Sequence, residues 1–155
     1  MADILNASEI ESFLKEQWIL RIGAHNGEKV YVVPLSYVFY EGAFYCHSPE
    51  GMKIEMMRAN PHVCVEVDEV LTTGKWISVI GWGRFEELKG EERSNAIRIL
   101  IDNLPSVMPS YTKKQSPEWP FTTGSGEDVP GVIFRIQPDE LTGRYETERT
   151  SPKIA

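Results

Sequence analysis

The sequence predicts a mainly β protein, a small antiparallel barrel of about seven strands with three short helices at its edges. Two observations lead to this fold class. Runs rich in β-branched and aromatic residues alternate apolar with polar positions over much of the chain. Turn signals follow several of these runs closely, as they do in hairpins. The 155 residues fit one domain, expected to span residues 1–155.

The first element is expected to be a helix over about residues 8–16. Either Asn6 or Ser8 can serve as its N-cap, and Glu11 stands three residues after Ser8, the spacing of a capping box. The segment therefore has the start signal of a short amphipathic helix.

Three antiparallel strands are expected next, over about residues 17–24, 29–39 and 42–47. The turns between them read "HNGE", which contains the strong hairpin signal Asn-Gly, and "YEGA". Pro34 falls inside the middle strand. Because proline has no N–H, the backbone near residues 33–36 needs a bulge or an unpaired edge, and its polar groups are available to another partner.

The middle of the chain predicts a helix and two strands. The segment "PEGMKIEMMRANP" is typical of a short helix that ends at Asn60-Pro61. An alternating run over residues 62–70 predicts a half-buried strand, and residues 75–88 predict a longer one. Gly81 and Gly83 in the longer strand indicate a bulge or the close approach of another group.

The last part combines a helix, a long irregular segment and β structure. Residues 90–104 carry apolar positions at helical spacing, and a proline-rich segment follows from Pro105 to the strand that begins near residue 131. The segment "GVIFRIQPDELTGRYE" is interpreted as a strand, a turn and a final short strand.

Composition excludes some classes of function. The net charge is −7, and the 16 Lys and Arg residues are scattered, so a nucleic-acid partner is not expected. No apolar stretch approaches 18 residues, so no membrane span is expected. The N-terminus is acidic and lacks the basic and apolar regions of a signal peptide, and a cytoplasmic location is therefore expected.

His47, Ser48 and Lys53 stand close together where a strand ends and a helix begins. A helix N-terminus offers free N–H groups and a partial positive charge, and with a hydroxyl, an imidazole and an ammonium group it suits a phosphate. The alternative interpretation is structural, in which Ser48 caps the helix, His47 ends the strand and Lys53 is solvated.

Other chemistry has less support in the sequence. The side chains that invite a zinc site are Cys46, His47, His62 and Cys64, but neighbouring residues of a strand point to opposite faces, and the chain has no CxxC or HxxxH pair. No metal is therefore expected. There is also no GxSxG elbow for a nucleophilic serine.

A family resemblance rests on two quoted stretches. "YVVPLSYVFYEGAFYCHSPEGMKIEMMRANPHVCVEVDE", followed by "WISVIGWGRFEEL", resembles the FMN-binding split-barrel proteins related to pyridoxamine 5'-phosphate oxidase. The branch that it looks most like is the nitroimidazole-reductase, or nitroimidazole-resistance, group, whose pattern reads "VVPLxFVYxxGxxYFHS…GxK…LRxNPxVCFEVD". The resemblance covers about residues 18–90 and the later "FRIQPDELTGR".

The resemblance implies a six-stranded split barrel that forms a homodimer, with FMN at the subunit interface. Carried over by position, His47, Ser48 and Lys53 hold the FMN phosphate. The segment made of Val33, Pro34, Leu35 and Ser36 runs along the isoalloxazine ring, and Ser78 takes the place of a glutamine that contacts the flavin in the oxidase.

The resemblance also has departures. Gly51-Met52-Lys53 replaces Ser-Arg-Lys of the oxidase, so that one phosphate-binding arginine is absent. The oxidase's C-terminal Arg and His motif is not evident, and oxidation of pyridoxamine phosphate is not expected. Three aromatic side chains are candidate walls of a substrate pocket: Trp82, Trp119 and Tyr37.

The function expected from the resemblance is that of an FMN-dependent oxidoreductase which takes electrons from a small-molecule donor and passes them to a small flat acceptor, such as a nitroaromatic or a quinone. Two alternatives remain open at this stage. One is a flavin carrier or sensor without turnover, and the other is a split barrel that uses a deazaflavin or haem.

Overall fold

The computed structural model describes residues 2–109 and 129–148. Within them, seven strands and three helices follow one another in the order β1 (Asp3–Ile4), α1 (Ala7–Glu16), β2 (Ile19–His25), β3 (Val30–Tyr40), β4 (Ala43–Ser48), α2 (Met52–Ala59), β5 (His62–Thr72), β6 (Lys75–Glu87), α3 (Gly90–Val107) and β7 (Val132–Glu146). None of these helices combines the length and apolar character that crossing a membrane requires.

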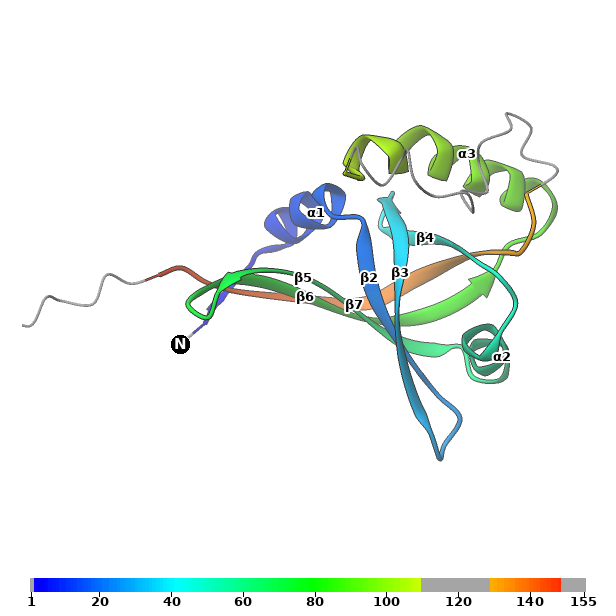
Figure 1. Ribbon diagram of the computed structural model, residues 1–155, viewed down its shortest axis with the longest axis horizontal. Helices are drawn as coiled ribbons and strands as arrows, with labels where there is room; N and C mark the ends of the chain where they lie inside the picture. Colours follow the sequence, from blue (N-terminus) through cyan, green and yellow to red (C-terminus); the bar gives the residue numbers. More distant parts are fainter. Residues whose placement is uncertain (1, 110–128, 149–155) are drawn as a thin grey trace, which may run out of the picture.

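Six of the strands close into a ring. The sheet order is β1-β7-β4-β3-β2-β5-β6, and β6 also pairs with β7 (Figure 1). This additional pairing closes strands β2 to β7 into a ring, and β1 lies outside it on β7. All pairings are antiparallel. The predicted mainly β barrel with flanking helices is thus confirmed.

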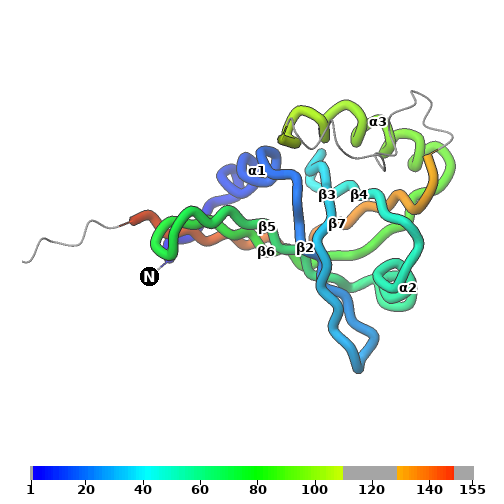
Figure 2. Tube along the Cα trace, viewed as in Figure 1, coloured from blue at the N-terminus to red at the C-terminus, as the bar shows by residue number. Residues whose placement is uncertain are grey.

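Two apolar clusters hold the ring together. The larger one fills the interior and includes Leu20, Tyr37, Phe44, Met57, Val65 and Phe134. The smaller one lies under α3, which covers the outer side of β3, β4 and β7. The β2–β3 hairpin projects from the rest of the ring, with its tip far from α3 (Figure 2).

Helix α1 begins one residue earlier than expected. Asn6 is its N-cap and accepts a hydrogen bond from the backbone N–H of Glu9, while the Glu9 carboxylate accepts one from the backbone N–H of Asn6. The capping box is therefore formed by Asn6 and Glu9. The expected pairing of Ser8 with Glu11 was wrong, because Ser8 already lies inside the helix.

Two predictions for the C-terminal half were also wrong. The segment 132–146 is one continuous strand in which Asp139 is an extra residue, because Trp82 pairs with Glu140 while Gly83 pairs with Pro138. This is a β-bulge instead of a turn. Helix α3 continues through Pro105 to Val107, because the buried side chains of Leu104 and Met108 anchor its last turn.

Candidate functional site

Strand β3 has a side along residues 30–36 that pairs with no other described strand. It pairs with β2 over its first seven residues, but with β4 only from Tyr37 to Tyr40. The N–H of Tyr37 donates to the carbonyl of Trp18 on the β2 side. Since alternate residues of a strand direct their N–H groups to opposite sides, Ser36 and its even-numbered neighbours direct theirs away from β2. The expected unpaired edge at Pro34 is thus confirmed, and no ladder bond is lost there.

The edge of β3 is open because β4 separates from β3 before its own last two residues. From His47 onwards β4 pairs only with β7, through His47 with Ile133 and Ser48 with Val132. The Ser48 hydroxyl is buried and donates to the carbonyl of Pro49 at 2.8 Å. Helix α2 has no side-chain cap, so the structural interpretation of Ser48 as its N-cap was wrong.

The His47 ring is held by the segment that precedes β7. Its Nε2 lies 2.5 Å from the carbonyl oxygen of Pro130, which can only accept, so Nε2 is the donor. Arg93 of α3 donates to the carbonyls of Val129 and Gly131 and fixes the same segment. Burial lowers the pKa of His47, and the nearby Arg93 charge lowers it further, against the opposing effect of the Pro130 bond.

Lys53 lies half-buried in the first turn of α2. It forms no ion pair with any other described residue. A cation at a helix N-terminus is unfavourable unless an anion is near, because the helix dipole is positive there. The uncapped N–H groups of α2 and the Lys53 ammonium group can together bind an anion.

We call the end of β4 at His47 and Ser48, together with the start of α2 at Lys53, the corner. An ion-pair network holds the corner in place. The Arg58 guanidinium group donates to both carboxylate oxygens of Glu50, at 2.8 and 2.9 Å, and to those of Glu87 on β6, at 2.6 and 3.1 Å. The hydrogen bond from Arg58 lowers the pKa of Glu87 to about 2. Both ends of α2 are thereby tied to the ring.

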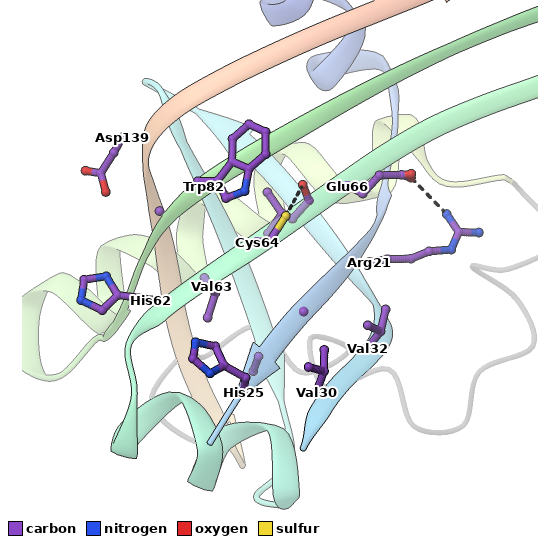
Figure 3. Close-up of a pocket in the computed structure, with 14 residues that line it drawn as sticks. Arg21, His25, Val30, Val32, His62, Val63, Cys64, Glu66, Trp82 and Asp139 are labelled. Carbon is purple, nitrogen blue, oxygen red and sulfur yellow. Dashed lines mark hydrogen bonds and ion pairs between the residues drawn. The ribbon is translucent and has the colours of Figure 1, made fainter. Parts of the chain in front are cut away.

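A cavity of about 610 Å³ forms a trough on the outer face of the ring (Figure 3). Its walls are mostly apolar, and Val30, Val32 and Trp82 are 75, 61 and 43% exposed. The polar and ionisable lining residues are Arg21, His25, His62, Cys64, Glu66 and Asp139. An apolar trough with few polar groups is typical of a small-molecule site.

Cross-strand register places some of the predicted flavin residues on this face. Cys64 pairs with Trp82, and Asp68 pairs with Ser78. Because side chains alternate between faces, the Cys64, Glu66 and Asp68 side chains share the face opposite the buried valines of β5. On β5, Glu66 therefore lies between Cys64, the partner of Trp82, and Asp68, the partner of Ser78.

Strand β3 borders the same face. Pro34 pairs with Arg21 of β2, and Arg21 pairs in turn with Glu66 of β5. Val33 and Leu35 point the other way, because both pack against the interior cluster. Of the four predicted residues on β3, Pro34 and Ser36 thus belong to the outer face, whereas Val33 and Leu35 direct their side chains to the interior and their N–H groups toward β2.

Two of the predicted aromatic walls have a different outcome. Tyr37 is fully buried, and its hydroxyl donates to the carbonyl of Leu14 at 2.7 Å, so its placement in a substrate pocket was wrong. Trp119 lies outside the described residues. Trp82 is the aromatic side chain of the trough.

Arg21, Glu66 and Asp68 form a charged group in the trough region that the sequence did not indicate. The Arg21 Nη1 is 3.3 Å from Asp68 Oδ2 and 3.8 Å from Glu66 Oε1, and Figure 3 shows Arg21 and Glu66 pointing toward each other. Glu66 Oε1 is buried and accepts no hydrogen bond from any described residue. Burial and the adjacent Asp68 carboxyl raise the pKa of Glu66 to about 7, although the Arg21 charge opposes the rise.

The raised pKa of Glu66 predicts how stability depends on pH. The folded protein holds this proton up to higher pH than the unfolded chain does, so the contribution of Glu66 to stability falls as pH rises from about 4.5 to about 7. Glu66→Gln should therefore increase the melting temperature relative to wild type more at pH 8 than at pH 4. Thermal unfolding followed by circular dichroism checks this, with Glu16→Gln on the exposed end of α1 as the control. An equal gain at both pH values would contradict it.

The comparisons with known proteins agree with this fold. The sequence profile of the family described as pyridoxamine 5'-phosphate oxidase matches residues 6–145. The chain is 26% identical over 149 residues to an uncharacterized protein of Rhizobium meliloti, an alignment that covers 91% of this chain and 93% of that protein.

Solved structures resemble the chain over nearly its full length. An FAD-binding protein from Mesorhizobium loti is 32% identical, with a TM-score of 0.72 and coverage of 96% of this chain and 98% of the other. A candidate 5-nitroimidazole antibiotic resistance protein from Bacteroides thetaiotaomicron is 22% identical, with a TM-score of 0.67 and coverage of 94% and 87%. At that identity it shares the fold, and the nitroimidazole-resistance group is only a distant structural neighbour.

Proposed function

Because the chain belongs to the pyridoxamine 5'-phosphate oxidase family, we propose that it is a flavin-dependent oxidoreductase that binds FMN and reduces a small flat acceptor, such as a nitroaromatic or a quinone. The observation that carries the proposal is Lys53. Its side chain is half-buried at the start of α2, which has no side-chain cap. Helix α2 shortly follows the end of β4, the strand whose departure leaves one side of β3 unpaired among the described residues. When bound, the flavin supplies hydride or electron transfer.

The residues of the corner fit a phosphate in part. Lys53 and the first N–H groups of α2 supply positive charge and donors, and the Arg58 network keeps them in place. The Ser48 hydroxyl is engaged with Pro49 and has to turn in order to donate to a phosphate. His47 supports the corner through its bond to Pro130, so we assign it the role of positioning the strand end.

The unpaired side of β3 fits the polar edge of a flavin ring. The N–H of Ser36 and the carbonyls of Pro34 and Ser36 lie on that side, where no strand within residues 2–109 and 129–148 accepts or donates. Trp82 lines the trough, and Ser78 pairs with Asp68 on the same face, so both lie on β6, the strand next to Glu66. These residues would orient a ring and its acceptor, while the apolar walls exclude water.

FAD is a second candidate cofactor, because the Mesorhizobium loti relative is named as FAD-binding. A visible absorption spectrum of the purified protein, with the released nucleotide identified by chromatography, separates FMN from FAD. A haem spectrum, or a protein that binds neither FMN nor FAD, would overturn the proposal. Bound flavin that no nicotinamide donor or acceptor can turn over would favour a carrier or sensor.

We further propose that a second copy of the chain covers the outer face, with the trough between the two copies. The supporting observation is the exposed apolar surface of Val30, Val32 and Trp82, which a monomer rarely leaves in contact with water. Val32→Glu should shift the apoprotein from dimer toward monomer in sedimentation equilibrium, with about a tenfold weaker association, because a charge is then buried at the contact.

A matched control exists for this variant. Val70→Glu changes a valine of similar exposure, with Val70 63% and Val32 61% exposed. Val70 lies near the end of β5 that does not line the trough. It should leave the dimer intact. A Val32→Glu protein that stays dimeric would argue against this face as the interface.

A further inference from the structure

We propose that Glu66 is the proton donor to the acceptor that binds in the trough, and this inference rests on the proposed function. Glu66 lines a mostly apolar cavity large enough for a small aromatic molecule, and the exposed indole of Trp82 lines the same cavity. Glu66 falls on the Glu of the quoted "NPxVCFEVD" pattern, and the resemblance gave it no role.

The two oxygens of the Glu66 carboxyl have different surroundings. Oε1 is buried, lies 3.8 Å from Arg21 and has no hydrogen-bond donor among the described residues. The side chain as a whole is 28% exposed, so the oxygen that a molecule in the trough can reach is Oε2. A carboxylate with one unsatisfied buried oxygen is unfavourable, and the site therefore favours a proton on this group near neutral pH.

The neighbouring charges favour the same state. Arg21 lies closer to Asp68 than to Glu66, at 3.3 against 3.8 Å, so its charge is matched mainly by Asp68. A negative Asp68 next to Glu66 disfavours a second negative charge. Strands β3 and β6 present uncharged residues at this level, Pro34 and Ile80. The other titratable groups that line the trough are Cys64 on β5, the histidines His25 and His62 at one end, and Asp139 of β7.

The chemistry of the acceptor needs such a donor. A quinone becomes a hydroquinone by taking up two electrons and two protons. The hydride of the proposed function brings both electrons and one proton, and the second proton has to reach an oxygen of the acceptor. Glu66 would give it from Oε2, so that an O–H bond forms on the acceptor and the carboxyl becomes a carboxylate. A proton from solvent then restores the acid.

The first test needs no flavin. Glutamate carrying ¹³C in its side chain is incorporated into the apoprotein, and the Glu66 carboxyl signal, assigned by its loss in Glu66→Gln, is titrated by NMR. The expected midpoint is about 7, and Asp68→Asn should move it to lower pH. A midpoint at the ordinary value for glutamate would overturn the proposal.

The second test uses flavin-loaded protein reduced anaerobically and mixed with one of two oxidants in a stopped-flow instrument. Benzoquinone takes up protons when reduced, whereas ferricyanide takes one electron and no proton. At pH 7, Glu66→Gln should slow reoxidation by benzoquinone on the order of 100-fold and leave reoxidation by ferricyanide unchanged. Glu69→Gln, an exposed carboxylate on the same strand, should change neither rate.

The outcomes separate this inference from the proposed function. Wild-type protein that binds no flavin refutes the function, and the titration then still reports on Glu66. Protein that binds and reduces flavin normally, with benzoquinone reacting equally fast in Glu66→Gln and wild type, refutes the proton donor alone. Equal slowing with both oxidants would also refute it, because the residue would then affect electron transfer or access.

Discussion

Lys53→Ala is expected to weaken FMN binding by about 10- to 100-fold. The substitution removes a charge-assisted hydrogen bond to the phosphate, on the order of 1.5–3 kcal/mol. It leaves the fold intact, because Lys53 makes no ion pair within the described residues and its neighbours Ile54 and Met57 provide the packing of α2. Titration of the apoprotein with FMN, followed by flavin fluorescence, measures the change.

Two comparisons make this result specific to the phosphate. Riboflavin has no phosphate, so its affinity should be the same for Lys53→Ala and for wild type. Lys75→Ala removes the same charge at the exposed start of β6 and should not affect FMN. If riboflavin and FMN lose affinity equally, Lys53 supports the fold of the corner and does not contact the phosphate.

Gly83→Ala is expected to destabilise the protein by about 3 kcal/mol, the upper range for overpacking, and to lower the melting temperature by about 10 °C. A Cβ at this position would meet the backbone of β7, 2.8 Å from the Cα of Pro138 and closer still to the carbonyl oxygen of Gln137. Backbone atoms cannot move aside as a flexible side chain can. Asp139, the bulged residue at this contact, also lines the trough.

Gly74→Ala provides the control for this prediction. It adds the same methyl group in the β5–β6 turn, where the nearest atom is the Cγ of the Glu148 side chain at 3.6 Å, an ordinary contact. Urea unfolding of both variants at one pH gives the comparison. A Gly83→Ala protein as stable as Gly74→Ala would mean that β7 is free to shift at its bulge.

Most of the strands could be predicted because their patterns are local. Alternating β-branched residues and the Asn-Gly turn mark β2, β3 and β5 within two residues of their observed bounds. Strand β7 failed because Pro138 and Asp139 have the chemistry of a turn, and the same residues also suit a bulge. The two-residue strand β1 has no pattern of its own, and it forms only because Asp3 meets Tyr145 from the far end of the chain.

The candidate site divides in the same way. The corner at Lys53 was predictable, since the end of a strand and the start of a helix are adjacent in sequence. The bond from His47 to Pro130 was not, because the two residues are 83 positions apart. Arg21 and Glu66 each look like ordinary surface charges on alternating strands. Only the register between β2 and β5 reveals that they meet in an apolar trough.

Pro34 has a consequence for solubility. A strand edge with free N–H and carbonyl groups is a template on which another chain can add a strand, and proteins commonly protect such edges. On the open side of β3, Val32 and Ser36 offer N–H groups, while Pro34 between them offers none. An incoming strand therefore finds a break in the middle of the ladder. Pro34, which the fold accommodates because this edge is open, therefore also protects the protein from aggregation through that edge.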